Sequence, residues 1–153
     1  MLALIALVPC VYLAAVTPAL WTTDVDERRL PNRLVLPGYL VAAAAACGLW
    51  AATGQAPAVA LASGLAYFAF LLVLSLAGGM GMGDVKLGGV LGLAAGLIAP
   101  AAAVGAPVIA FAVGGIGALV TLVRGRGGTS IPFGPFMLAG FWGAVALAVF
   151  VRL

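Results

Sequence analysis

The sequence predicts an all-α, polytopic membrane protein with about six transmembrane helices. Of its 153 residues, 65% are hydrophobic and only 7% are charged, whereas soluble domains are about 45–50% apolar and about 25% charged. Apolar runs of roughly 20 residues, long enough to span a bilayer as a helix, recur along the chain. The alternating pattern that is typical of membrane β-barrel strands does not occur in the sequence.

Six apolar segments can be drawn, and together we expect them to form a single domain over residues 1–153. They cover residues 2–21, 34–52, 56–77, 85–99, 102–123 and 135–152. The first has no basic residue before Arg28, so it is predicted to be a retained helix and not a signal peptide. The fourth would be only about 22 Å long, less than a roughly 30 Å hydrocarbon core. It either continues past Pro100 or forms a short helix that begins below the membrane surface.

The basic residues predict how the chain crosses the membrane. Six of the seven lie in three alternate connections between the segments, at Arg28, Arg29, Arg33, Lys86, Arg124 and Arg126. With six spans these connections share one side, which the positive-inside rule makes cytoplasmic, and both termini lie outside. Arg152 is the exception, a terminal residue that can snorkel to the interface. The net charge of +3 is too dispersed to indicate nucleic-acid binding.

The residue inventory excludes two kinds of chemistry. There is no histidine, and the two cysteines, Cys10 and Cys47, lie apart within apolar runs. A zinc site of the usual kind needs four Cys or His ligands or a comparable set. We therefore expect no metal, no cofactor and no histidine-based catalysis.

The chain has four acidic residues, and three of them lie in "TTDVDERRLPNRL". Asp26 and Glu27 are interpreted as part of a solvated interfacial turn. Asp24 is nearest to the end of the first apolar run, and for it the turn and a functional role are equally supported. Pro31 disfavours helix in the residue before it, and Asn32 is predicted to cap the second helix.

The fourth acid, Asp84, lies in "GGMGMGDVKL", residues 78–87. It either caps the fourth helix, where a negative charge is favourable by about 0.3–1 kcal/mol, or points into the bundle. Gly88, Gly92 and Gly96 recur every four residues, and Asp84 precedes them by four. Small residues let membrane helices approach closely. If the helix begins at or just before Asp84, the carboxylate shares this packed face.

Two aspartates from different helices on one membrane side suggest acid–base chemistry. Like charges close together cannot both ionise easily, so one pKa rises and the pair shares a proton. An ionised carboxylate can then activate water while the protonated one polarises a peptide carbonyl. The sequence leaves open which of Asp24 and Asp84 holds the proton. Lys86 does not face Asp84, because residues two apart on a helix point in different directions, and it is interpreted mainly as a topology and lipid-headgroup residue.

At these residues the chain resembles the type IV prepilin leader peptidases. "GMGD" (81–84) is similar to the GxGD signature of intramembrane-type aspartic proteases, and "GMGDVKL" fits the longer GxGDxKL form. In "DVDERRLPN", Asp24 lies seven residues before Pro31, as in the first motif of that family. "IPFGPFM" (131–137) looks like the stretch before the family's last helix. The similarity covers essentially the whole chain.

The resemblance implies an endopeptidase of the cytoplasmic (inner) membrane that cuts the short basic leader from type IV pilin or pseudopilin precursors at the cytoplasmic face. It implies Asp24 and Asp84 as the catalytic pair, with Asp26 as the competitor for the first position. The supporting motif residues are Leu30, Pro31, Asn32, Gly81, Gly83 and Lys86. The paired CxxC motifs of long family members are missing, so the chain looks like the peptidase-only form of Flp/Tad pilus systems and archaeal preflagellin peptidases, and no methyltransferase activity is expected.

A non-enzymatic function is the alternative. A small cation or proton transporter, or a pilus assembly factor, would use the same aspartates as ligands or proton carriers. Transport sites usually lie near the middle of the bilayer, whereas both aspartates are predicted at one surface. The sequence therefore favours the peptidase.

Overall fold

The computed structural model describes residues 1–124 and 131–151, and every regular element in these ranges is a helix. The helices are α1 (Leu2–Glu27), α2 (Asn32–Thr53), α3 (Ala58–Leu76), α4 (Met82–Ile98), α5 (Pro100–Val123) and α6 (Gly134–Phe150). The first three and α5 are long and apolar enough to cross a membrane, and α6 is a shorter apolar helix. The predicted all-helical, multi-pass membrane fold is therefore confirmed. Arg126 and Arg152 lie outside the described residues.

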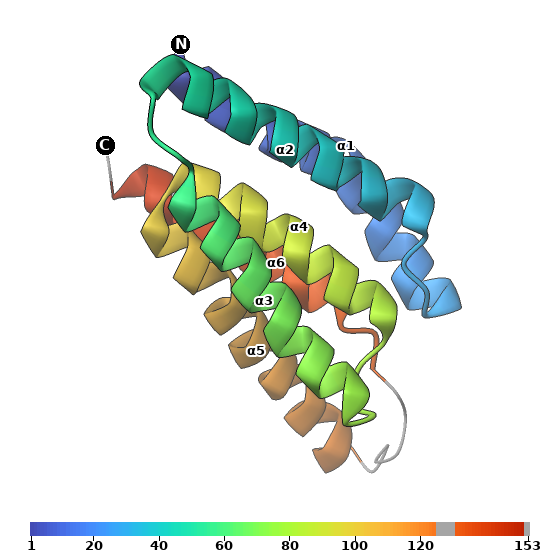
Figure 1. Ribbon diagram of the computed structural model, residues 1–153. Coiled ribbons are helices and arrows are strands. Elements are labelled where there is room, and N and C mark those ends of the chain that lie inside the picture. Colours follow the sequence, from blue (N-terminus) through green and yellow to red (C-terminus); the bar gives the residue numbers. More distant parts are fainter. Residues whose placement is uncertain (125–130, 152–153) are drawn as a thin grey trace.

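The helices form three layers (Figure 1). The antiparallel pair α1–α2 covers one side of α4 and α6, and α3 and α5 cover the other. The central helix α4 contacts all five others. The turns after α1 and α3 lie at one end of the bundle, with the end of α5 and the start of α6, and the start of α1 and the end of α6 lie at the other. We call the first of these the loop end. The predicted alternation of the connections is thus seen in the described part of the fold.

Helix α1 is longer than the first apolar segment. It continues from residue 21 to Glu27, because polar residues beyond the apolar run remain helical at the surface. The helix ends where Arg28 takes a left-handed conformation with φ 53° and donates its N–H to the carbonyl of Asp24 at 3.0 Å. Such a conformation is uncommon for a residue with a side chain. Asp24 consequently lies in the last turn of a helix and not in a loop.

The predicted capping role of Asn32 is wrong. The N-cap of α2 is Pro31, with φ −68° and ψ 126°, and no side chain caps the helix. The proline ring fixes φ near the value that the chain needs just before the helix. Asn32 becomes the first helical residue, and its side-chain oxygen accepts a hydrogen bond from Lys86 of α4 at 3.1 Å.

Helix α4 is a short helix in the middle of the bundle. It ends at Ile98, and Pro100 begins α5, so the alternative in which it continues past Pro100 is wrong. Its 17 residues span about 25 Å. The glycine stripe is packed, as predicted: Gly92 lies against the backbone of Ser63 and Gly64, and Gly96 lies against Ala60, all on α3. This close packing against α3 thus fixes the position of α4 along its axis and its rotation about that axis, and α4 carries Asp84.

Candidate active site

Asp24 and Asp84 line one pocket at the loop end of the bundle. The pocket has a volume of about 310 Å³ and is lined by Asp24, Arg28, Arg29, Leu30, Gly81, Met82, Gly83 and Asp84. It is built from the last turn of α1, the turn that follows, and the first turn of α4. Asp26 is exposed and does not line it. The fold thus brings together the two aspartates that the sequence singles out.

Asp24 is held by the backbone of the last helix. Its side chain is 5% exposed, and it is the one buried charged residue in the described part of the chain. The N–H of Gly134, the first residue of α6, donates to Asp24 Oδ2 at 2.9 Å. A Cβ atom at Gly134 would lie 2.7 Å from this oxygen, so only glycine allows the approach.

Asp84 lies in the first turn of α4, and its carboxyl group makes fewer hydrogen bonds than it could. Its Oδ1 atom is buried and has no hydrogen-bond partner among the described residues. An unpaired buried polar atom costs about 1–3 kcal/mol, and more if it is charged. A partner for this oxygen, such as water or, when the oxygen carries the proton, a substrate carbonyl, would therefore be bound favourably.

Both carboxyls lie outside the apolar spans, just beyond residue 21 and just before residue 85. Their surroundings raise the pKa of each. Burial, and secondly the negative charge of Asp24, raise the pKa of the Asp84 carboxyl to about 7, while the Gly81 amide opposes this shift. Burial also raises the pKa of Asp24, and the hydrogen bond from Gly134 opposes it. A carboxyl with a pKa near 7 holds its proton about half of the time at neutral pH. The pair is therefore suited to share one proton.

The turn after α1 and the first turn of α4 pack against each other. A Cβ atom at Gly83 would lie 3.0 Å from that of Leu30, so the turn packs directly on the glycine. Lys86 donates to Asn32 as described above, and the Tyr39 hydroxyl of α2 donates to the carbonyl of Lys86 at 2.8 Å. Among the contacts in the described structure, Lys86 thus joins α2 to α4 and does not pair with Asp84.

The family follows from the same residues. A sequence model of the type IV leader peptidase family matches residues 10–122, about three quarters of the chain. The chain belongs to the type IV leader peptidase family. The protein is therefore a peptidase, of a family that acts on prepilin-type substrates. No curated protein and no solved structure matches the chain significantly.

The match contains the two aspartates of this leader peptidase but not the contact that orients one of them. It ends at residue 122, before α6 begins at Gly134. The sequence indicated this region only through the likeness of "IPFGPFM" and assigned Gly134 no role. Arg28 and Arg29, which the sequence places in a basic connection, are exposed and also line the pocket. A backbone donor leaves no side-chain signature, and a glycine followed by a proline at the start of a helix was the one available signal.

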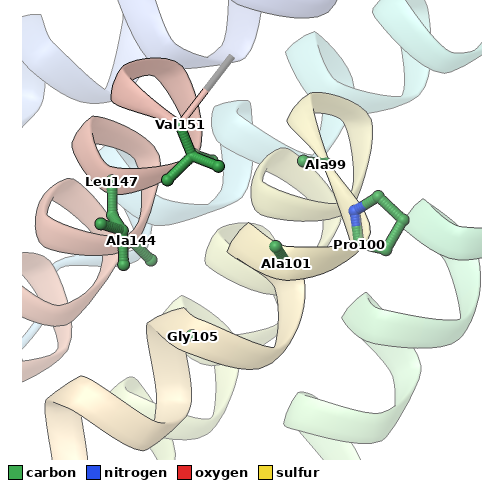
Figure 2. Close-up of a pocket in the computed structure, with 8 residues that line it drawn as sticks. Ala99, Pro100, Ala101, Gly105, Ala144, Leu147 and Val151 are labelled. Atoms are coloured by element: carbon green, nitrogen blue, oxygen red, sulfur yellow. The ribbon is translucent and has the colours of Figure 1, made fainter.

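A larger hollow in this leader peptidase lies at the opposite end of the bundle (Figure 2). Its volume is about 430 Å³, and it lies between the start of α5 and the end of α6. It is lined by Ala99, Pro100, Ala101, Gly105, Ala144, Leu147, Ala148 and Val151. None of these side chains ionises, so the hollow offers no acid–base chemistry. Among the described residues, no three His, Cys, Asp or Glu side chains come together as a metal site.

The bond between Lys86 and Asn32 predicts a measurable coupling between α2 and α4. Lys86→Met keeps the aliphatic stem and removes the donor, and Asn32→Leu removes the acceptor. We expect a double-mutant cycle on the free energy of unfolding in detergent to give about 0.5–1.5 kcal/mol. Arg33→Met, which removes a positive charge from the same turn of α2, is the matched control. If the coupling energy between Lys86 and Asn32 is no larger than that between Lys86 and Arg33, Lys86 acts on lipid alone.

Proposed function

We propose that the protein is an aspartic endopeptidase that removes the short basic leader from type IV pilin or pseudopilin precursors, with Asp24 and Asp84 as its catalytic pair. The observation that carries the proposal is the pocket that both carboxylates line. The raised pKa of Asp84, and the exposure of Asp26 outside the pocket, support this choice of partners.

The proposed reaction consumes one water molecule and needs no metal or cofactor. The ionised aspartate takes a proton from water as the water oxygen bonds to the scissile carbonyl carbon, and the protonated aspartate gives its proton to the carbonyl oxygen. The first aspartate, now protonated, then protonates the amide nitrogen, and the second takes a proton back from the gem-diol. The C–N bond breaks, a carboxylic acid and an amine leave, and both aspartates regain their starting states.

The proposed location is the cytoplasmic face of the inner membrane, with both termini outside. The positive-inside rule supports this orientation, because the loop end carries Arg28, Arg29, Arg33, Lys86 and Arg124. A substrate that is itself anchored by an apolar segment would present its leader at this surface. We further propose that residues 1–153 act as one peptidase domain embedded in lipid, without methyltransferase activity.

The function is tested with the purified protein in detergent and a synthetic peptide that has a basic leader followed by an apolar segment. We expect a single cut at the end of the leader, detected by mass spectrometry, and no effect of added EDTA, since the two carboxylates suffice. A peptide whose leader has neutral residues in place of the basic ones is the control. No cleavage in this assay, together with cation or proton uptake by proteoliposomes, would instead favour the transporter.

A further inference from the structure

The N-terminus of α6 has one donor to offer, and Asp24 takes it. The first N–H groups of a helix have no partner within the helix. Pro135 has no N–H, and the N–H groups of Phe136 and Met137 bond to the carbonyl of Phe133 at 3.0 and 3.1 Å. The N–H of Gly134 is the one that reaches out of the helix, and its acceptor is Asp24 Oδ2, 110 positions earlier in the chain.

Asp84 has no comparable partner at its buried oxygen. If Asp84 ionises, its charge is shared by two oxygens; the Gly81 amide stabilises the anion, but Oδ1 remains buried with no hydrogen-bond partner in the described structure, which is costly. If Asp24 ionises, the charge falls on an oxygen that already accepts a hydrogen bond from a helix N-terminus. Each carboxyl lies at a helix N-terminus, Asp24 at that of α6 and Asp84 in the first turn of α4, so the helix dipoles favour both anions, and the difference is the unpaired Oδ1 of Asp84. The two halves of the pocket are therefore unequal.

We propose that the Gly134 N–H is a positioning group that holds Asp24 as the ionised member of the pair and leaves Asp84 as the protonated member. This inference rests on the proposed function for its catalytic meaning. It assigns Asp24 as the base that takes the proton from water and Asp84 as the acid that donates to the scissile carbonyl oxygen. It also fixes the direction from which Asp24 acts, because one of its two oxygens is occupied by Gly134.

Few other charged or titratable groups lie near the two carboxyls, and one of them, the buried Tyr67 hydroxyl of α3, interacts electrostatically with Asp84. Arg28 and Arg29 come from the turn after α1, and Asp84 comes from α4. Lys86, also on α4, donates to Asn32. The described residues of α6 include no ionisable side chain. The contact between Gly134 and Asp24 is therefore the feature that distinguishes the two carboxylates on the α6 side.

Carbodiimide labelling tests the assignment without any catalytic readout. Dicyclohexylcarbodiimide adds to protonated carboxyl groups in apolar surroundings, and the chain has four acidic side chains, so each can be followed by peptide mass spectrometry. At pH 6 we expect Asp84 to label several-fold more than Asp24 in the wild-type protein. Labelling of Asp84 should fall as the pH rises through about 7, because the group is protonated only below its pKa. The exposed Asp26 and Glu27 serve as references outside the pocket.

Gly134→Ala should abolish the difference. The added Cβ displaces Asp24 Oδ2 from its donor, so labelling of Asp24 should rise towards that of Asp84. Gly143→Ala on the same helix is the matched control, because the nearest atoms to its new Cβ lie 3.7 Å away. In cleavage assays, Gly134→Ala should also move the acid limb of the pH profile upward by about 0.5–1 unit, the loss of one hydrogen bond. A purely structural role would lower the rate equally at every pH.

The wild-type labelling alone can overturn the inference. If Asp24 labels as readily as Asp84, or more readily, Gly134 does not hold it ionised, whether or not the Gly134 variant folds. This failure is distinct from failure of the proposed function. A wild-type protein that cleaves the peptide but labels in the reverse order overturns only the assignment, and one that labels as expected but does not cleave overturns only the peptidase proposal.

Discussion

Asp24→Asn and Asp84→Asn are each expected to lower the rate of leader cleavage by about 10²–10⁴-fold, the range that a positioned general acid or base contributes. Asparagine has nearly the shape of aspartate, but it neither takes a proton from water nor donates one to a carbonyl oxygen. At position 24 it also keeps an oxygen that can accept the hydrogen bond from Gly134. The loss should therefore be chemical, with the fold intact.

The control for this result is Asp26→Asn, two residues from Asp24 on the exposed side of the same helix. It should cleave at the wild-type rate, and all three variants should unfold at similar temperatures in detergent. The double variant should be hardly slower than either single one, because the two carboxyls act as a unit. Near-normal cleavage by Asp24→Asn or Asp84→Asn refutes the two-carboxylate mechanism. An inactive Asp26→Asn beside an active Asp24→Asn would replace Asp24 by Asp26 in the pair.

The helices were predictable because lipid leaves the backbone few choices. A lipid-exposed segment must satisfy its own N–H and C=O groups, so each long apolar run becomes a helix. All six predicted segments match a helix to within a few residues, except at the end of α1. There the apolar run ends at residue 21, but the helix continues for six more residues to Glu27. That extension is what carries Asp24 on a rigid element.

The site was predictable only in part, for a different physical reason. Acidic side chains are easily recognised in a sequence that is almost entirely apolar, so Asp24 and Asp84 could be singled out. The predicted topology then placed both at one membrane surface. The contacts that orient them are made by groups that do not stand out in this way. Gly134 acts through its backbone N–H, and the Asn32 side chain, predicted to cap α2, instead accepts a hydrogen bond from Lys86 of α4. Both depend on how helices distant in sequence pack, which no local pattern encodes.

The glycine stripe of α4 leads to the second large effect, on stability. A Cβ atom at Gly92 would lie 2.6 Å from the carbonyl oxygen of Ser63 and 2.9 Å from the Cα atom of Gly64. Both are backbone atoms of α3, which cannot rotate away as a side chain can. Gly92→Ala therefore requires α3 and α4 to separate, and it weakens the bond of 2.8 Å from Ser63 Oγ to the Gly92 carbonyl. We expect a loss of about 1–3 kcal/mol in the free energy of unfolding.

Gly115→Ala on α5 provides the comparison, because a Cβ atom there meets nothing within 4 Å. In helical positions alanine is better than glycine by about 1 kcal/mol, so the α5 variant should be as stable as the wild type or more stable. The displaced α4 of Gly92→Ala carries Asp84 at its start, so cleavage should fall together with stability, although Gly92 lies two helical turns from the carboxyl. A Gly92→Ala protein as stable as Gly115→Ala would show that α3 and α4 are less tightly packed than the structure has them. If Gly92→Ala is destabilised yet fully active, the packing of α4 against α3 does not control the distance between the two aspartates. The loop 77–81 must then position Asp84 independently of that packing.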